Sequence, residues 1–369
     1  MNNPEIFMRE ALDEARKGWG NTHPNPMVGA VIVESGKVVA RGYHAKSGQA
    51  HAEVNALVDL GRKPLTNATI YVTLEPCSST GDTGPCTQAI LESGLKKVVV
   101  GAIDPDERHR GRGIEILREN RVEVTTCVCQ ADCEDLNLIF NQVAQKGSPL
   151  IAGKTATTLD GKVATRNGHS KWITGELARA DVMRWRRLFP ATAVGAGTVM
   201  VDNPQLTSRS DVSEYCPRRI IFDRRGLTIA QWKEHRIYTD EFQGRTTLVT
   251  VDGVPDPREM ADEGISIWTL PNKTGDFWNS FKKRCIEKNI TGIYVEGGPG
   301  LMSDLLAHRQ LDYLFAYRAP KFLSDDASPA FVSGQEVSLM ANCFGLTDVR
   351  HAIFGEDQLT RGHLQYPDQ

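Results

Sequence analysis

Hydrophobic residues in the first part of the chain recur with two different periods. Short apolar runs of strand length are bounded by Gly, Ser or charged residues, and between them the apolar positions follow helical spacing. Residues 27–33 and 38–44, separated by turn residues, predict a β-hairpin. Further strands are predicted at residues 68–74, 96–104 and 121–129, and helices at residues 5–17, 50–60, 86–94 and 113–120. This alternation predicts an α/β domain with a largely internal sheet.

The same alternation begins again after a polar segment at residues 145–149, which is typical of a linker. A chain of 369 residues is long for one hydrophobic core. We therefore expect two domains, residues 1–146 and residues 147–369. In the second domain the pattern predicts strands at residues 150–157, 192–199, 219–223, 246–251, 265–270, 292–298 and 311–320, and helices at residues 176–188, 275–288 and 300–308.

Composition and charge narrow the range of functions. Hydrophobic residues make up 40% and charged residues 24% of the chain, as in ordinary globular proteins. The net charge of −3 gives no reason to expect nucleic-acid binding, because proteins that bind polyanions usually carry a basic surplus. The sequence shows no export signal and no apolar run of membrane-spanning length, so we expect no membrane contact and a cytoplasmic location. In that compartment the eight cysteines are expected to be thiols or metal ligands rather than disulfides.

Three residues that ligate metals lie at the ends of predicted elements. His51 begins a helix, Cys77 follows a strand, and Cys86 begins the next helix. One imidazole and two thiolates provide three of the four ligands of Zn²⁺ and leave one position for water, which is typical of a catalytic site. Glu53, two residues after His51, is then placed to transfer protons rather than to bind the metal. The alternative is a capping histidine with two cysteines buried as small apolar residues.

The spacing of these residues meets the usual deaminase pattern only in part. Zinc nucleobase deaminases carry His-x-Glu followed by Pro-Cys-x-x-Cys, whereas eight residues separate Cys77 from Cys86. Cys127, Cys129 and Cys133 resemble a second metal cluster, but no nearby His or fourth Cys completes it. Unligated thiols are therefore the preferred interpretation of these three.

The second half contains two glycine turns in place of a G-x-G-x-x-G motif. Residues 194–199 and 294–300 each run from a strand into glycines, and the second turn leads into a helix whose N-terminus is suited to phosphate. Such turns are common, so alone they are a weak indication of a cofactor.

Longer motifs in both halves resemble one family. "HPNPMVGAVIV" (23–33), "HAEVNAL" (51–57) and "TLEPCSSTGDTGPC" (73–86) resemble the N-terminal half of the bifunctional riboflavin-biosynthesis deaminase–reductases. "KTATTLDGKVA" (154–164), "SKWIT" (170–174), "VGAGTVMVDNPQLTSR" (194–209) and "YVEGG" (294–298) resemble its reductase half in the same order. The resemblance implies a cytidine-deaminase-like three-layer α/β/α domain followed by a dihydrofolate-reductase-like α/β domain.

For the first domain the resemblance implies one zinc ion per chain, held by His51, Cys77 and Cys86. It assigns proton transfer to Glu53 and contacts with a pyrimidine substrate to Asn25 and His44. In the family the longer interval between the cysteines is the normal one, and the loop it forms helps to hold the substrate.

For the second domain the resemblance implies NADPH as the cofactor. The residues that would line the cofactor are Ala156, Trp172, Thr198, Asp202 and the turn that begins at Gly298. Those that would face the substrate are Lys154, Ser170, Arg186, Leu206, Arg209 and Glu296, and Lys154 or Glu296 would assist proton movement at the sugar. Without the motifs, core packing for Trp172 and a solvated helix face for Arg186 are the simpler interpretations.

The implied reaction has two steps on one pyrimidine nucleotide. A diaminopyrimidine ribosylamino-phosphate is deaminated by hydrolysis, and its ribosyl group is then reduced by NADPH to a ribityl chain. We also expect a homo-oligomer, either a dimer or a tetramer.

The chain departs from the family pattern in the loop between the two cysteines. Ser79, Asp82 and Gly84 stand where the family commonly has His, a cation and Pro. Arg108, His109, Arg110 and Arg112 could replace the missing positive charge, although a solvated basic turn is an equally good interpretation. Three alternatives remain at this point: a reductase whose deaminase half is impaired, a nucleic-acid-editing zinc deaminase, and a non-enzymatic binding protein.

Overall fold

The computed structural model describes residues 3–79, 84–209, 214–334 and 337–367, and it divides the chain into two compact units. The first unit is Met1–Ser148 and the second is Pro149–Gln369. Helix α6 (Leu138–Lys146) runs up to the junction, so the first two residues of the expected linker, Gln145 and Lys146, are helical instead. Gly147 ends this helix with a positive φ of 60°.

The first unit contains a five-stranded mixed sheet. Its strand order is β2-β1-β3-β4-β5, formed by β1 (Gly29–Glu34), β2 (Lys37–Tyr43), β3 (Thr69–Leu74), β4 (Lys97–Ala102) and β5 (Glu123–Thr125). The hairpin β1–β2 is antiparallel as predicted, and β3, β4 and β5 run parallel. All six residues of β1 are buried, because the strand is covered on both faces.

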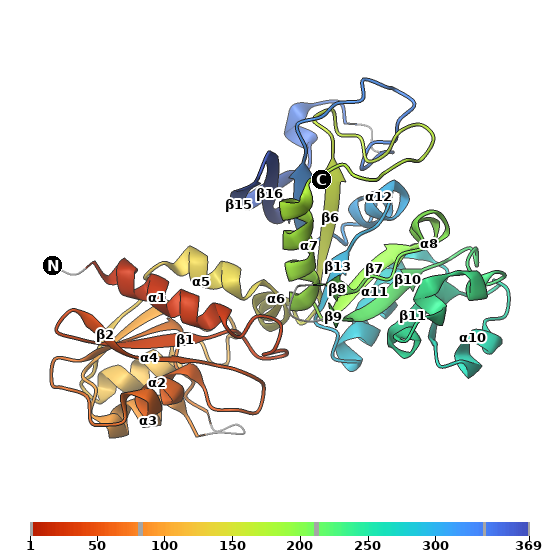
Figure 1. Cartoon of the computed structure of the whole chain (residues 1–369). Coiled ribbons are helices and arrows are strands. Elements are labelled where there is room, and N and C mark those ends of the chain that lie inside the picture. Colours follow the sequence, from red (N-terminus) through yellow and green to blue (C-terminus); the bar gives the residue numbers. More distant parts are fainter. Residues whose placement is uncertain (1–2, 80–83, 210–213, 335–336, 368–369) are drawn as a thin grey trace. The chain divides into compact units, whose positions relative to one another are not determined.

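Helices cover both faces of this sheet and give three layers (Figure 1). On one face α1 (Pro4–Arg16) packs with α5 (Gln130–Leu136), and on the other α2 (Ala52–Leu60), α3 (Cys86–Ser93) and α4 (Arg112–Glu119) lie side by side. A Cβ atom on Gly42 of β2 would lie 2.3 Å from the carbonyl oxygen of Ala52. Only glycine therefore lets the start of α2 pack directly on β2, and this contact fixes the position of His51.

The predicted strand at residues 121–129 is shorter than expected. It ends at Thr125, and Cys127 and Cys129 have positive φ values of 66° and 54°, which no strand allows. The two cysteines therefore do not lie along one face of a strand, as the sequence pattern had suggested. All eight cysteines belong to the described residues, and each is a free thiol.

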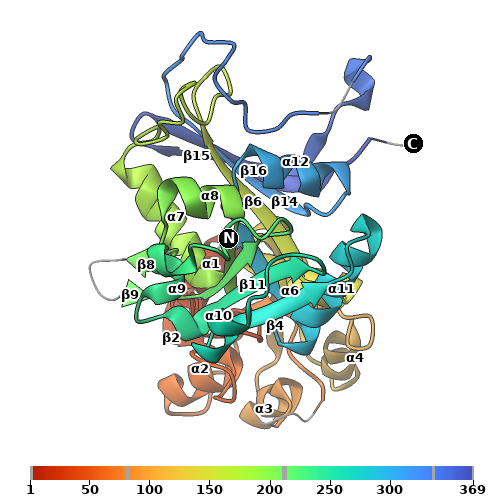
Figure 2. The same cartoon turned by 90° about the vertical axis from the view of Figure 1, so that its right-hand side faces the viewer.

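The second unit is built on a nine-stranded sheet with the order β12-β11-β10-β7-β13-β6-β14-β16-β15. In this sheet order, every strand from β12 through β14 is parallel to its neighbours. The hairpin β15–β16 adds an antiparallel edge beyond β14 (Figure 2). The parallel strands are β6 (Leu150–Thr157), β7 (Ala191–Gly195), β10 (Arg218–Phe222), β11 (Thr246–Val251), β12 (Ser266–Leu270), β13 (Gly292–Val295) and β14 (Tyr313–Arg318). The hairpin consists of β15 (Gly345–Phe354) and β16 (Asp357–Gln365).

Alternate residues of these strands belong to two hydrophobic clusters, one on each face of the sheet. Ile220 and Phe222 pack with α11 (Thr274–Glu287) and α12 (Pro299–Ala307). Ile221 packs instead with α8 (Ala196–Asp202), α9 (Arg236–Thr239) and α10 (Arg258–Asp262). Helix α7 (Glu176–Leu188) covers β13 and β14 through Trp185, which contacts Phe315. The second unit is therefore also an α/β/α arrangement.

A short ribbon and three 3₁₀ turns complete the described chain trace. The two-stranded ribbon β8–β9 pairs Ser208–Arg209 with Glu214–Tyr215, and 3₁₀ turns lie at Trp232–Glu234, Gln243–Arg245 and Met340–Asn342. The predicted strand at residues 192–199 ends earlier, at Gly195, because residues from Ala196 onward form α8. None of the helices in the described part of the chain is both long and apolar enough to span a membrane.

Candidate active sites

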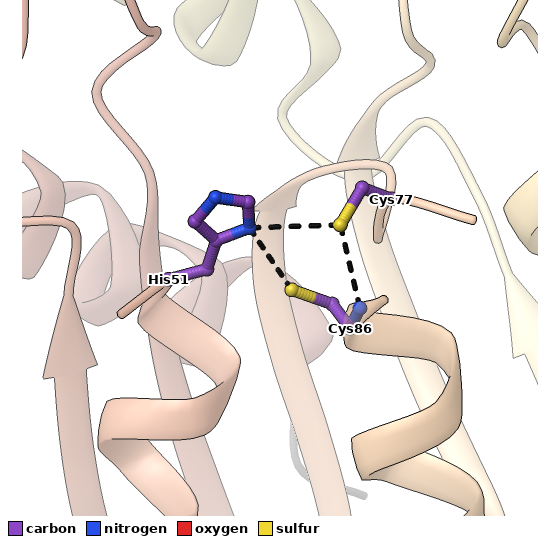
Figure 3. Close-up of side chains that lie close together, drawn as sticks. All are labelled: His51, Cys77 and Cys86. Carbon is purple, nitrogen blue, oxygen red and sulfur yellow. Dashed lines mark hydrogen bonds between the residues drawn. The ribbon is translucent and has the colours of Figure 1, made fainter. Parts of the chain in front are cut away.

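The first candidate site brings together the three predicted zinc ligands (Figure 3). His51 Nδ1 lies 3.1 Å from Cys86 Sγ and 3.5 Å from Cys77 Sγ. All three ligand atoms lie within 4.8 Å of one another, and among the described residues they form the one such group of His, Cys and carboxylate side chains. One imidazole nitrogen and two sulfur atoms at these separations suit a tetrahedral zinc ion with one open position.

Element ends hold the three ligands in place. His51 is the N-cap residue of α2, Cys86 is the first residue of α3, and Cys77 follows β3. The backbone N–H of Cys86 donates to Cys77 Sγ at 3.3 Å, and the N–H of Thr87 donates to the carbonyl oxygen of Cys77 at 3.2 Å. Hydrogen bonding with Cys86, followed by that with His51, lowers the pKa of Cys77, whereas the hydrogen bond with Cys77 and burial raise the pKa of Cys86. The arrangement therefore favours a thiolate at Cys77, the form that binds metal.

Glu53 lies in the first turn of α2, beside the ligand group. Its side chain is buried, and burial raises the pKa of this carboxyl to about 7. A carboxyl group with a pKa near neutrality is well suited to accept a proton and return it.

Asn25 and His44 meet next to the ligand group. Asn25 Nδ2 lies 3.2 Å from His44 Nε2, and His44 Nδ1 lies 3.2 Å from the carbonyl oxygen of Ala50. The His44 ring packs edge-on against the His51 ring at 5.3 Å, and burial lowers the pKa of His44. A neutral imidazole that donates from Nδ1 to Ala50 and accepts from Asn25 satisfies both contacts.

Glu75 connects the segment of the cysteine ligands to the loop after β4, and sequence reasoning gave it no role. Its buried carboxylate accepts hydrogen bonds from the backbone N–H groups of Asp104 at 3.1 Å, Gly111 at 2.9 Å and Gly113 at 2.9 Å. The last two N–H groups belong to the N-terminus of α4, where a negative charge is favourable. Glu75 therefore fixes the basic turn at residues 106–112 beside Cys77. In the sequence its only signal was an acidic residue two positions before Cys77.

The residues that depart from the family pattern are only partly described. Ser79 is exposed, and Asp82 lies outside the described residues. In the basic turn, Arg108 forms an ion pair with Asp106 at 2.6 Å. Arg110 and Arg112 are exposed.

The second candidate site is a cavity of about 940 Å³ at the carboxyl edge of the parallel strands in the second unit. In an open α/β sheet this edge is the usual place for a ligand. Nine residues that the sequence assigned to the reductase line this one cavity: Lys154, Ala156, Ser170, Arg186, Thr198, Asp202, Leu206, Glu296 and Gly298. A Cβ atom on Gly298 would lie 3.5 Å from Thr198 Oγ1, so the two glycine turns face each other across a narrow gap.

Three charged side chains meet at one end of this cavity. Arg186 donates from Nε and Nη2 to the carboxylate of Glu296, the second bond at 2.9 Å, and Lys154 Nζ lies 4.0 Å from Glu296 Oε2. Burial opposes ionisation of Glu296, but the charges of Arg186 and Lys154 outweigh it and lower its pKa. Burial also lowers the pKa of Lys154. The cluster thus combines an ammonium group that gives up its proton readily with a carboxylate that stays charged.

Two predicted residues do not line the cavity. Trp172 is 67% exposed, and the guanidinium of Arg179 stacks 4.4 Å from the centre of its ring. Arg209 is an exposed residue of β8, immediately before residues that are not described. Conversely, Arg224 and Arg225 line the cavity at the end of β10, and sequence reasoning missed them because no motif surrounds them.

Comparisons with known proteins agree with this division into two sites. The sequence model of the family named RibD C-terminal domain matches residues 149–359. The sequence model of the family named cytidine and deoxycytidylate deaminase zinc-binding region matches residues 1–102. The riboflavin biosynthesis protein RibD of Bacillus amyloliquefaciens is 37% identical over 352 residues, which cover 95% of this chain and 92% of that protein. RibD of Aquifex aeolicus (strain VF5) is 39% identical over 322 residues, or 87% and 88% of the two chains.

Solved structures show the same relationship. Acinetobacter baumannii RibD superimposes with a TM-score of 0.80 at 33% identity and covers 98% of both chains. A diaminohydroxyphosphoribosylaminopyrimidine deaminase/5-amino-6-(5-phosphoribosylamino)uracil reductase from Thermotoga maritima gives the same TM-score, identity and coverage. These matches confirm the predicted pair of folds, the zinc-dependent deaminase half and the NADPH-dependent reductase half. The chain therefore belongs to the RibD family of bifunctional riboflavin biosynthesis proteins.

Proposed function

We propose that this chain deaminates diaminohydroxyphosphoribosylaminopyrimidine and then reduces the resulting 5-amino-6-(5-phosphoribosylamino)uracil, the two compounds in the name of its Thermotoga relative. One observation carries the proposal. Three candidate zinc ligands lie together in the first unit next to the buried Glu53, and a cavity with a Lys–Glu–Arg cluster lies in the second. Neither an impaired deaminase half nor a nucleic-acid editor explains both sites.

In the deaminase step, we assign the metal ligands to His51, Cys77 and Cys86 and proton transfer to Glu53. Zinc, when bound, polarises a water molecule and makes it a nucleophile. The Glu53 carboxylate accepts a proton from the attacking water and delivers it to the amino nitrogen of the ring, so that the carbon–nitrogen bond breaks and ammonia leaves. Asn25 and His44, hydrogen-bonded to each other beside His51, orient the pyrimidine ring.

In the reductase step, we assign the substrate end of the cavity to Lys154, Arg186 and Glu296. NADPH, when bound, supplies a hydride to the sugar carbon. Glu296 holds Arg186 and Lys154 in place through its carboxylate, and the Lys154 ammonium donates a proton to the sugar oxygen as the ring opens. Burial of Lys154 favours this donation, because it lowers the pKa of the ammonium group.

We assign the remaining roles as the family resemblance implies them. Ser170 and Leu206 are proposed to face the substrate, and Ala156, Thr198, Asp202 and Gly298 to contact the cofactor; all six line the cavity. Trp172 remains a proposed contact of the cofactor, and Arg209 remains a proposed contact of the substrate. Trp172 lies two residues after the cavity residue Ser170, and Arg209 lies three residues after the cavity residue Leu206.

The test supplies the diaminopyrimidine nucleotide with and without NADPH, and measures ammonia release and NADPH oxidation separately. We expect ammonia in both samples and oxidation of NADPH only after deamination. Ammonia release without any NADPH oxidation, or oxidation before ammonia is released, would contradict the two-step proposal.

We also infer a homo-oligomer, a dimer or a tetramer, in the cytoplasm. β15 lies at the edge of the nine-stranded sheet and exposes Val349 and Ile353, which a second copy would cover. Eight free thiols suit a reducing compartment. Light scattering after size-exclusion chromatography measures the assembly, and cell fractionation measures the location; a monomer or an exported protein would contradict the inference.

A further inference from the structure

The segment that carries Asn25 lies outside the five-stranded sheet. β1 begins only at Gly29, and residues 26–28 belong neither to a helix nor to a strand. Asn25 nevertheless has a defined position, because its Nδ2 lies 3.2 Å from Nε2 of the buried His44. A segment without strand neighbours needs other partners for its buried backbone groups. The position of Asn25 therefore depends on what binds the backbone between it and β1.

The side chain of Asn137 binds both backbone groups of Met27, two residues after Asn25. Its Oδ1 accepts a hydrogen bond from Met27 N at 2.8 Å, and its Nδ2 donates to the carbonyl oxygen of Met27 at 2.9 Å. Both residues are buried, although 110 positions separate them in the sequence. A carboxamide presents an acceptor and a donor side by side. Asn137 thus binds this segment as a neighbouring strand would.

The next two residues are held from other directions. The carbonyl oxygen of Val28 accepts a hydrogen bond from His44 N at 2.9 Å. Gly29 N donates to Oγ1 of the buried Thr73 at 3.1 Å. These contacts fix the start of β1, whereas the two bonds at Met27 hold the backbone nearer to the proposed substrate contact.

Asn137 does not use its side chain in the way that its place in the chain suggests. It is the N-cap residue of α6, and asparagine at an N-cap commonly accepts a hydrogen bond from the first turn of its own helix. Among the described residues, its side chain forms no such capping bond. The carboxamide is bound to Met27 instead, so it holds the segment before β1 rather than the helix that it begins.

We propose that Asn137 is a positioning residue of the deaminase. By holding Met27 it fixes the backbone ahead of β1, and so it aligns the Asn25 carboxamide with His44 and with the pyrimidine ring. Asn137 acts through Met27 and Asn25 rather than on the reacting atoms. This inference rests on the proposed function, in which Asn25 contacts the pyrimidine.

The experiment measures ammonia release by the full-length, zinc-loaded chain over a range of concentrations of the diaminopyrimidine nucleotide. Asn137→Ala removes both bonds to Met27, and we expect KM to rise about tenfold, as when one hydrogen bond to the substrate is weakened. We expect kcat to stay close to wild type, because loss of a contact that binds substrate and transition state alike raises KM alone. Zinc content and NADPH oxidation with the deaminated nucleotide should match wild type.

Asn137→Ser tests the same contact with less risk to the fold. Serine is as good an N-cap residue as asparagine, so it can cap α6, but its single hydroxyl oxygen cannot bind both backbone groups of Met27. We expect a similar rise in KM with little change in the melting temperature. Asn141→Ala is the matched control, because Asn141 lies on the same helix and donates from its side chain to the carbonyl oxygen of Glu134. It should leave KM unchanged.

A double-mutant cycle tests whether Asn137 acts through Asn25. Asn25→Ala alone is expected to raise KM at least as much as Asn137→Ala, because it removes the substrate contact itself. If Asn137 acts by positioning Asn25, then Asn137→Ala should add little in the Asn25→Ala background. A role in stability alone would instead give independent effects that multiply.

An unchanged KM in the folded Asn137→Ala and Asn137→Ser variants would overturn the proposal, as would multiplying effects in the cycle or loss of zinc from the folded variants. Thermal melts show which variants are folded. Each of these results leaves ammonia release by the wild-type chain intact, so it removes only the role of Asn137. Absence of ammonia release from the zinc-loaded wild-type chain would remove the proposed deaminase function and this inference with it.

Discussion

The two sites of this chain are assembled in different ways. The deaminase ligands come from the ends of α2, β3 and α3, and each lies within a few residues of a helix terminus or a strand end. The reductase cavity takes its side chains from β6, β7 and β10, from the segments that follow these strands and β13, and from α7, so its lining extends from Lys154 to Pro329 in the sequence. A compact site depends strongly on each single ligand, whereas a distributed cavity divides its binding energy among many contacts.

The largest expected difference between the sites comes from a metal ligand. Cys86→Ser is expected to lower zinc content and to reduce deaminase activity by about a thousandfold or more, because a weaker ligand replaces a buried thiolate. NADPH oxidation with the deaminated nucleotide should remain close to wild type. Metal analysis and two separate activity assays check the result.

Cys127→Ser is the matched control for this prediction, since Cys127 is an exposed thiol of the same unit. It should change neither zinc content nor activity. Full zinc retention in Cys86→Ser would show that the ligand set is wrong.

The strongest test of the reductase cavity removes the carboxylate that joins Arg186 to Lys154. Glu296→Gln leaves two largely buried cations without their partner, and we expect the rate of NADPH oxidation to fall about a hundredfold. Ammonia release should not change. Glu287→Gln, on α11 of the same unit, is a control that keeps the change in charge but lies on an exposed face. A loss of both activities in Glu296→Gln would mean that the two sites are not independent.

A steric test examines the link between Glu75 and the zinc site. In Gly113→Ala the new Cβ would lie 2.1 Å from the carbonyl oxygen of Pro76, next to Cys77, so the backbone must shift. We expect a loss of about 1–3 kcal/mol in the free energy of unfolding and a weaker affinity for zinc. Denaturant unfolding and competition with a chelator measure the two effects.

Gly84→Ala provides the comparison for this variant, because among the described residues other than its chain neighbours no atom lies within 4 Å of the added Cβ, and its φ is not positive. It should be neutral in both measurements. Equal effects of the two substitutions would contradict the role of the contact between Gly113 and Pro76.

The smallest expected effect is a dependence of stability on pH in the reductase unit. The pKa of Glu296 is lower in the folded chain than its ordinary value of 4.5. The carboxylate therefore stabilises the fold above that value, and the contribution is lost as the pH falls through the folded pKa. Wild type should be more stable than Glu296→Gln at neutral pH, and the difference should shrink in acid, where the wild-type side chain is also neutral. Thermal melts between neutral pH and pH 3 check this, and a constant difference would contradict it.

The sequence predicted the deaminase site better than the reductase site for a structural reason. His51 and Cys86 belong to short motifs at helix starts, and the helical pattern fixes where those starts lie. Asn25 also meets a residue that is close to it in sequence. The β1–β2 hairpin returns the chain so that His44 lies within hydrogen-bonding distance of Asn25. For such residues, element boundaries and spacing together determine which side chains meet.

Other parts were not predictable from local patterns. Glu75 reads as one acidic residue before a proline, and only the fold reveals the three backbone N–H groups from residues 104–113 that surround its carboxylate. Helix α5 and the β15–β16 hairpin were absent from the predicted elements. Arg224 and Arg225 gave no signal either, since their place in the cavity lining depends on which strands lie beside β10 in the sheet.

The sequence alone determined the alternation of strands and helices, the two-part organisation and the three candidate zinc ligands, because these follow from periodicity and from residues within or between neighbouring elements. The tertiary structure decided which loops share the carboxyl edge of the nine-stranded sheet, and so which side chains line one cavity. That choice depends on strand order, which is fixed by packing among residues far apart in the chain. It is also why Arg224 and Arg225, which line this cavity, emerged only from the structure.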